Sequence, residues 1–188
     1  MPEWLFDVLL VAGILFVVGL YISWRASRLD RLHARVDTAR AALDAALVRR
    51  SAVALELAAS RLLDPATSLL LAAAAHEART ADADGREFAE SDLSRALRAV
   101  VEQPDFRGNV VQREDGGTLL DELESAAHKV AFARRFYNDA AATIRSARRK
   151  LLARLLPLAG NATLPEFFEI DDDPPEPSRS TRPGTAGL

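Results

Sequence analysis

Apolar and charged positions divide the chain into three segments. Residues 8–24 are 17 consecutive positions without a charged side chain, close to the roughly 20 residues that cross a bilayer. From residue 25 to about residue 170, apolar residues recur at the three- and four-residue spacing of amphipathic helices. The remaining residues are rich in aspartate and proline and show no such period. The pattern therefore predicts a short N-terminus and membrane anchor over 1–24, a helical bundle over 25–170 and a disordered acidic, proline-rich tail over 171–188.

The flanks of the apolar run predict how it would sit in a membrane. Trp4 lies at one end, and Tyr21 and Trp24 lie at the other, which is typical of interfacial aromatic belts. No Lys or Arg precedes the run, whereas five arginines follow it within 16 residues. Because positive charge marks the cytoplasmic side, we expect a single-pass protein of the cell membrane with its N-terminus outside and its C-terminal domain in the cytoplasm. A buried core helix is the alternative interpretation.

Proline and alanine indicate the fold class. Alanine, the best helix former, occurs 35 times, and proline, which ends helices, is confined to a few positions. We expect an all-α protein in which an N-terminal transmembrane helix continues into an elongated antiparallel four-helix bundle. Four helices that assemble only as an oligomer are the alternative. The segments expected are a first helix that runs on from the anchor over about 25–63, helices over 65–81 and 86–102, a loop over 106–117 and a last helix over 118–156.

The last predicted helix carries a coiled-coil-like seam. One bulky residue recurs every seven positions, and the first four of these are each followed three residues later by alanine, which allows close helix packing. The bulky positions are Leu123, Val130, Tyr137, Ile144 and Leu151, and the small ones are Ala126, Ala133, Ala140 and Ala147.

Arg50 interrupts the apolar series of the first predicted helix. One hypothesis is that Arg50 or its neighbour Arg49 meets a carboxylate of the second or fourth helix inside the bundle and so fixes the register of the helices. The alternative is that both arginines face water.

Composition and motifs argue against an enzyme. The absence of cysteine excludes a disulfide framework, a thiolate metal site and a cysteine nucleophile. A net charge of −3 argues against a nucleic-acid binder. The three histidines lie in three different predicted helices, and neither a zinc-hydrolase motif nor a glycine-rich phosphate loop is present. The run Asp171–Asp173 would bind a cation only if a fold converged its carboxylates, so solvated charge is the favoured interpretation. We therefore expect no catalytic, cofactor or metal site.

Basic residues gather at two places that an antiparallel bundle would bring together. If the last helix returns toward the anchor, they form a membrane-proximal collar that attracts anionic lipid headgroups. The alternative is that the second group complements the dipole at a helix C-terminus. The collar consists of Arg25, Arg28, Arg31, Arg35, Arg145, Arg148, Arg149, Lys150 and Arg154.

A stretch of the last predicted helix resembles a known family. Together with the N-terminal anchor and the segments Leu97–Phe106 and Leu164–Phe168, it is similar to the bacterial LemA family of membrane-anchored helical proteins, over roughly residues 8–170. The chain departs from the family pattern after Arg50, where Ser51–Glu56 lacks the usual proline. The resemblance implies an all-α bundle on a single-pass anchor, and the family has no established biochemical activity. The family-like motif is Ala133, Arg134, Arg135, Phe136, Tyr137, Asn138 and Asp139.

These observations favour a structural or interaction protein, a scaffold held at the inner face of a bacterial membrane. Its expected partners are the lipid bilayer and an unidentified protein or a second copy of the chain, with no nucleic acid. The alternative function is an accessory or regulatory subunit of a membrane protease or envelope-stress system. A helical enzyme whose site the sequence does not reveal is a third.

Overall fold

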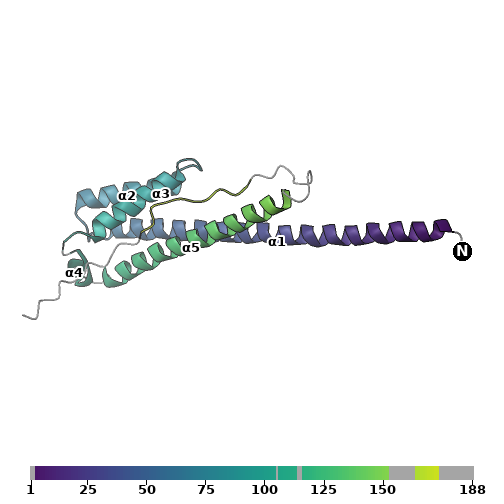
Figure 1. The fold of residues 1–188 in the computed structure, drawn as a ribbon. Coiled ribbons are helices and arrows are strands. Elements are labelled where there is room, and N and C mark those ends of the chain that lie inside the picture. Colours follow the sequence, from purple (N-terminus) through teal and green to yellow (C-terminus); the bar gives the residue numbers. More distant parts are fainter. Residues whose placement is uncertain (1–2, 105, 114–115, 153–163, 174–188) are drawn as a thin grey trace, which may run out of the picture. The chain divides into compact units, whose positions relative to one another are not determined.

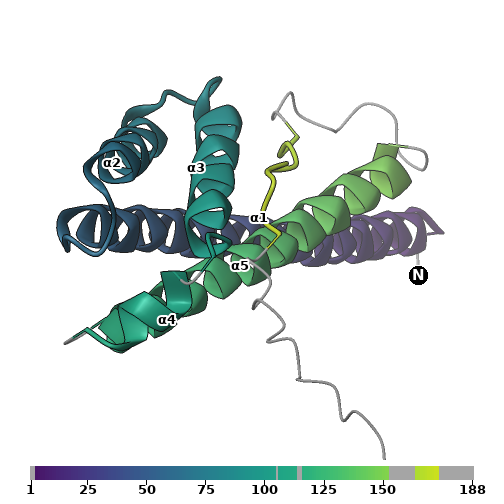
Figure 2. The same ribbon diagram turned by 90° about the vertical axis from the view of Figure 1, so that its left-hand side faces the viewer.

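The computed structural model describes residues 3–104, 106–113, 116–152 and 164–173. Within these ranges, the side chains of residues 3, 5, 6, 22, 25–29, 109, 148 and 150–152 are not described. The described chain is helical and contains no strand, which confirms the all-α prediction (Figures 1 and 2). Its helices are α1 (Glu3–Ala59), α2 (Pro65–Thr80), α3 (Arg86–Val101), α4 (Phe106–Val111) and α5 (Gly116–Leu152).

The chain forms two compact units, and two of its helices contribute to both. The first unit comprises Met1–Ala41 and Tyr137–Phe167, and the second comprises Ala42–Phe136 and Phe168–Leu188. The second unit therefore contains the end of α1, all of α2, α3 and α4, and the start of α5.

The prediction of a transmembrane helix is corrected. Over the described residues, no helix has an apolar stretch long enough to cross a membrane. The side chain of Ile22 and those of residues 25–29 lie outside the description. The single-pass assignment, the outside N-terminus and the cytoplasmic location all depend on this helix, so they are corrected with it.

The seam of the last helix is confirmed wherever its side chains are described. In the second unit, Leu123, Ala126, Val130 and Ala133 are buried along α5. In the first unit, the buried seam residues of α5 are Tyr137, Ala140 and Ile144. Ala147 is half-buried, and Leu151 lies outside the described side chains. The seven-residue repeat therefore identifies the face of α5 that packs.

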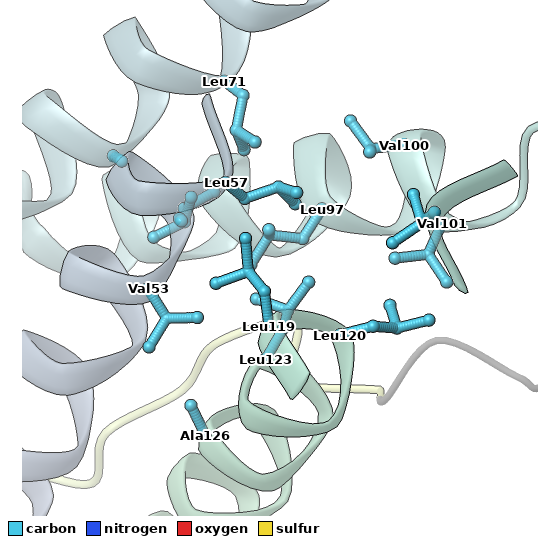
Figure 3. Close-up of a cluster of buried hydrophobic side chains, with 14 of the residues drawn as sticks. Val53, Leu57, Leu71, Leu97, Val100, Val101, Leu119, Leu120, Leu123 and Ala126 are labelled. Atoms are coloured by element: carbon cyan, nitrogen blue, oxygen red, sulfur yellow. The ribbon is translucent and has the colours of Figure 1, made fainter. Parts of the chain in front are cut away.

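The core of the second unit is a cluster of aliphatic side chains from all five helices (Figure 3). Val53 and Leu57 of α1 pack with Leu119 and Leu123 of α5, and Leu97 contributes from α3. In this unit α1 and α5 run in opposite directions (Figure 1), as predicted. Burial of these side chains is the main favourable term in folding the unit, at roughly 1.5–3 kcal/mol for each large aliphatic group.

Helix α2 begins where the sequence places a start signal. Asp64 is the N-cap residue, and its carboxylate accepts hydrogen bonds from the backbone N–H groups of Ala66 and Thr67, both at 3.0 Å. Pro65 occupies the first helical position, where the missing N–H costs nothing. The hydrogen bond from Thr67 lowers the pKa of Asp64. The predicted bounds of the second and third helices agree with α2 and α3 to within a residue or so.

The segment expected as a loop over 106–117 instead contains the short helix α4. Its residues Phe106 and Val110, four positions apart, are both buried in the core of the second unit. The first residue of α5, Gly116, lies so close to α4 that a Cβ there would overlap the backbone carbonyl of Val110. Glycine is therefore required at Gly116 by close backbone approach.

Replacing this glycine is expected to weaken the fold. We expect Gly116→Ala to lower the free energy of unfolding by about 1–3 kcal/mol, because the α4–α5 turn must shift to admit the methyl group. The control is Gly117→Ala, where an added Cβ meets no atom within 4 Å. Urea unfolding followed by circular dichroism measures both variants, and equal stability of the two would contradict the close approach.

Candidate functional site: an extended segment held by α3 and α5

A buried ion pair joins α1 to α3 within the second unit. The Arg50 guanidinium lies 2.7 Å from Glu90 Oε2, and the two side chains are only 3% and 2% exposed. Arg50 also donates to Ser94 Oγ at 2.8 Å and to the backbone carbonyl of Glu90 at 3.1 Å. Ser94 in turn donates to the same carbonyl at 3.0 Å. Among the described residues, Arg50 Nε has no hydrogen-bond partner.

The environment of this pair explains its electrostatics. Burial raises the pKa of Glu90, and the positive charge of Arg50 opposes that rise. A small cavity of about 140 Å³ lies beside the pair, with Ser51, Arg86 and Glu90 among its lining residues. The ion pair and its hydrogen bonds join α1 to α3 within this unit.

The two adjacent arginines behave differently. The hypothesis that Arg50 meets a carboxylate inside the bundle is confirmed, but the partner lies on α3, the third predicted helix, and not on the second or fourth. Arg49 does pair with a carboxylate of α5, that of Glu122, but this pair is only partly buried, with side chains 53% and 38% exposed. Periodicity places Arg50 within the apolar series of α1, but it shows neither that its side chain is buried nor which helix lies opposite.

On α3, the face next to this pair holds an extended segment of the same unit. We call residues 168–173 the strap; they lie between α3 and α5 (Figure 2). The backbone N–H of Glu169 donates to Glu87 Oε1 at 2.8 Å, and the N–H of Asp171 donates to Ser91 Oγ at 3.2 Å. Between them, the side chain of Ile170 is buried. Two side chains one helical turn apart on α3 thus bind alternate N–H groups of the strap.

Two arginines bind the carboxylates of the strap. Arg98 of α3 makes a two-point contact with Asp171, one arm at 2.7 Å. Arg134 of α5 makes a second two-point contact with Asp172, at 2.6 and 2.9 Å. Forked pairs of this kind are stronger and more directional than single charge contacts. Glu87, Ser91 and Arg98 of α3, with Arg134 of α5, form what we call the strap site.

The ion pairs between the strap and the strap site shift the pKa values of the paired groups, and each shift favours the charged form. The hydrogen bond from Arg98 lowers the pKa of Asp171, and the same bond raises the pKa of Arg98. The hydrogen bond to Asp172 likewise raises the pKa of Arg134. These shifts favour the ionised form on both sides, so the site is selective for negative charge at neutral pH.

The strap corrects two sequence-based expectations. The segment from residue 171 onward is expected to be disordered, yet residues 171–173 are described, and Asp171 and Asp172 are bound by arginines. Solvated charge is therefore the wrong interpretation for these two residues. Residues 174–188 lie outside the description. In the described chain, no cluster of acidic and histidine side chains is arranged to hold a metal ion.

The family-like motif lies where the two units divide α5, and its residues have different surroundings. In the second unit, Ala133 is buried, Arg134 binds the strap, and Arg135 and Phe136 are exposed. In the first unit, the hydroxyl of Tyr137 donates to the backbone carbonyl of Glu166 at 2.9 Å. Asn138 is half-buried and Asp139 is exposed. Two motif residues, Arg134 and Tyr137, thus hold the chain that follows α5.

The basic collar stays a prediction. It depends on an anchor beside the arginines, and the described helices provide none. Among its described members, Arg31, Arg35 and Arg149 are exposed on the first unit. Arg145 donates to the carbonyl of Pro165 at 3.3 Å and lies 4.9 Å from the centre of the Phe167 ring. The side chains of Arg25, Arg28, Arg148 and Lys150, and all of Arg154, lie outside the description.

No family model, curated protein or solved structure matches the chain. The resemblance to the LemA family therefore stays a prediction from its residues.

The buried pair should matter far more than its exposed neighbour. We expect Arg50→Leu to lower the free energy of unfolding by about 3–5 kcal/mol at neutral pH, because Glu90 is left buried without a partner. Arg49→Leu, the matched control, should cost less than about 1 kcal/mol. Urea unfolding followed by circular dichroism measures both.

The loss in Arg50→Leu should depend on pH. Without Arg50, the folded-state pKa of Glu90 rises further above its unfolded value. Such a group contributes stability below the unfolded pKa and loses it as pH rises through the folded pKa. The variant should therefore approach the wild type in acid and fall away toward neutral pH. A deficit that is constant with pH would rule out the buried carboxylate as its cause.

The pKa of Asp171 provides a direct reading of strap binding. Because this pKa is lowered in the folded state, the contribution of Asp171 is complete above the ordinary aspartate pKa and is lost as pH falls through the lower, folded value. Carboxyl NMR should show Asp171 titrating below its ordinary value, and Arg98→Gln should raise the midpoint toward that value. A midpoint unaffected by Arg98→Gln would contradict the pairing.

Proposed function

We propose that the protein is a structural or interaction protein, a helical scaffold that binds an extended protein segment at the strap site. One observation carries this proposal: each of the four side chains of the site is bonded to a backbone N–H or to a carboxylate of a peptide segment. Recognition of an extended segment through its main chain and its side chains is a recurrent way in which domains bind peptides.

Exposed apolar side chains support the same class of function. Along α1, large apolar residues including Leu9, Leu15 and Phe16 are exposed by more than half of their surface. Phe88 of α3 is also largely exposed. Contiguous apolar surface of this kind marks a contact with another molecule, because water does not favour leaving it uncovered.

The proposal predicts a specific protein contact beside the strap site. A photo-crosslinking amino acid is placed at Phe88, which is 68% exposed on α3 next to Glu87, in the full chain in its native cells. The matched control carries the same amino acid at Leu69, which is 71% exposed on α2. We expect protein adducts of defined mass from position 88 that are absent from position 69, and mass spectrometry identifies them.

Arg98→Gln in the position-88 chain should reduce the yield of these adducts, because it removes one of the two cations of the site. If position 88 yields no adducts above the level of position 69, the interaction proposal fails.

A further inference from the structure

We propose that the strap site binds an acidic extended segment of a partner protein, and that the strap is a built-in competitor for that segment. The inference rests on the proposed function and names the partner's chemistry: an apolar residue followed by two carboxylates, in extended conformation. The strap itself, with the sequence Phe-Glu-Ile-Asp-Asp-Asp over 168–173, is the pattern that the site accepts.

The main-chain contacts select a peptide over other anions. Ser91 and Glu87 accept hydrogen bonds from N–H groups two residues apart, which is the spacing at which an extended chain presents its N–H groups to one side. A phosphate has no N–H to donate, and the carboxylate of Glu87 would repel it. These two residues therefore restrict the site to protein segments.

The side-chain contacts select the sequence of the segment. Ile170 is buried between the two bonded N–H groups, so an apolar residue is required there. The forks of Arg98 and Arg134 then require carboxylates at the next two positions. With the strap bound, only about a fifth of each strap-site arginine side chain is exposed. Loss of the strap would therefore uncover two cations that attract another acidic segment.

The strap is bound in a way that permits exchange. Within the described residues it belongs to no helix or sheet, and its main chain contacts α3 through hydrogen bonds with side chains alone. Two are donated by N–H groups of the strap, and one is donated by Arg98 to the carbonyl of Asp173 at 3.3 Å. The carboxylate of Asp171 remains more than a third exposed, so its ion pair is partly screened by water. The main advantage of the strap is its covalent connection to α5, which supplies an effective concentration of the order of millimolar. A partner segment of similar or better fit competes against that concentration.

The test measures binding of a free copy of the strap to the full chain. The probe is an acetylated, fluorescein-labelled peptide with the sequence of residues 168–173, and fluorescence anisotropy at low salt reports binding. In the variant Asp171→Asn/Asp172→Asn, the chain's own strap loses its ion pairs with Arg98 and Arg134, so it no longer competes strongly for the strap site. We call this the released variant. We expect this variant to bind the probe at least about tenfold more tightly than the wild type does, which corresponds to roughly 1.4 kcal/mol.

Two controls identify the site and the chemistry. A peptide with asparagine at the positions of Asp171 and Asp172 should not bind, and adding Arg98→Gln/Arg134→Gln to the released variant should abolish binding of the acidic peptide. Equal affinity of the wild type and the released variant, or equal affinity for the two peptides, would overturn the inference. Circular dichroism confirms that the variants keep their helices.

A second measurement uses the wild type and does not depend on any variant. Millimolar unlabelled peptide should displace the strap, seen as a shift of the Asp171 amide signal in NMR spectra, whereas the asparagine peptide should leave it unchanged. If the acidic peptide fails in both experiments while the adducts at position 88 still form, this inference is contradicted and the proposed interaction function is not. If the adducts are absent while the peptide still binds, the proposed interaction function is contradicted instead.

Discussion

The second unit depends on the ion pair between Arg50 and Glu90. A guanidinium and a carboxylate with almost no exposure are tolerable only if each stays opposite the other, because an unpaired buried charge costs several kcal/mol. The pair therefore restricts both the rotation of α3 about its axis and its shift along α1. An aliphatic pair of the same volume would pack as well, but it would accept a wider range of helix positions.

The orientation of α3 has a direct consequence for the strap. Glu87, Ser91 and Arg98 follow one another at intervals of four and seven residues, so they share one helical face adjacent to the face that bears Glu90 and Ser94. Holding Glu90 toward α1 presents the other three toward the strap. Arg134 reaches the strap from α5, whose position in this unit is set by the aliphatic core with Val53 and Leu57. The core and the buried pair thus position the strap site without contacting the strap's carboxylates.

Sequence patterns predict the features that arise from local periodicity. The start of α2 at Asp64–Pro65, the bounds of α3 and the packed face of α5 all follow from signals within a few residues of one another. The interruption of the apolar series by Arg50 is visible for the same reason, although the series alone leaves open whether this arginine faces the interior or water. The strap is not, because Arg98 and Asp171 are 73 residues apart and no local rule links them. Charge and proline dominate the composition of residues 171–188, so composition predicts a solvated tail. The only local signal against that prediction is the apolar residue Ile170, directly before the aspartates. The transmembrane prediction rests on the length and flanks of one apolar run, and over the described residues no helix is long and apolar enough to cross a membrane.

The burial of Ile170 also fixes the register in which the three consecutive aspartates of the strap lie against the arginines. A shift of the strap by one residue would keep two carboxylates opposite two arginines, but it would place Asp171 where the isoleucine is buried. A shift by two toward the C-terminus would leave Arg134 opposite Pro174, which has no charge, and a shift of four would bring Pro175, which has no N–H, to Ser91. One apolar side chain before the acidic run and two prolines after it thus hold the run in a single register.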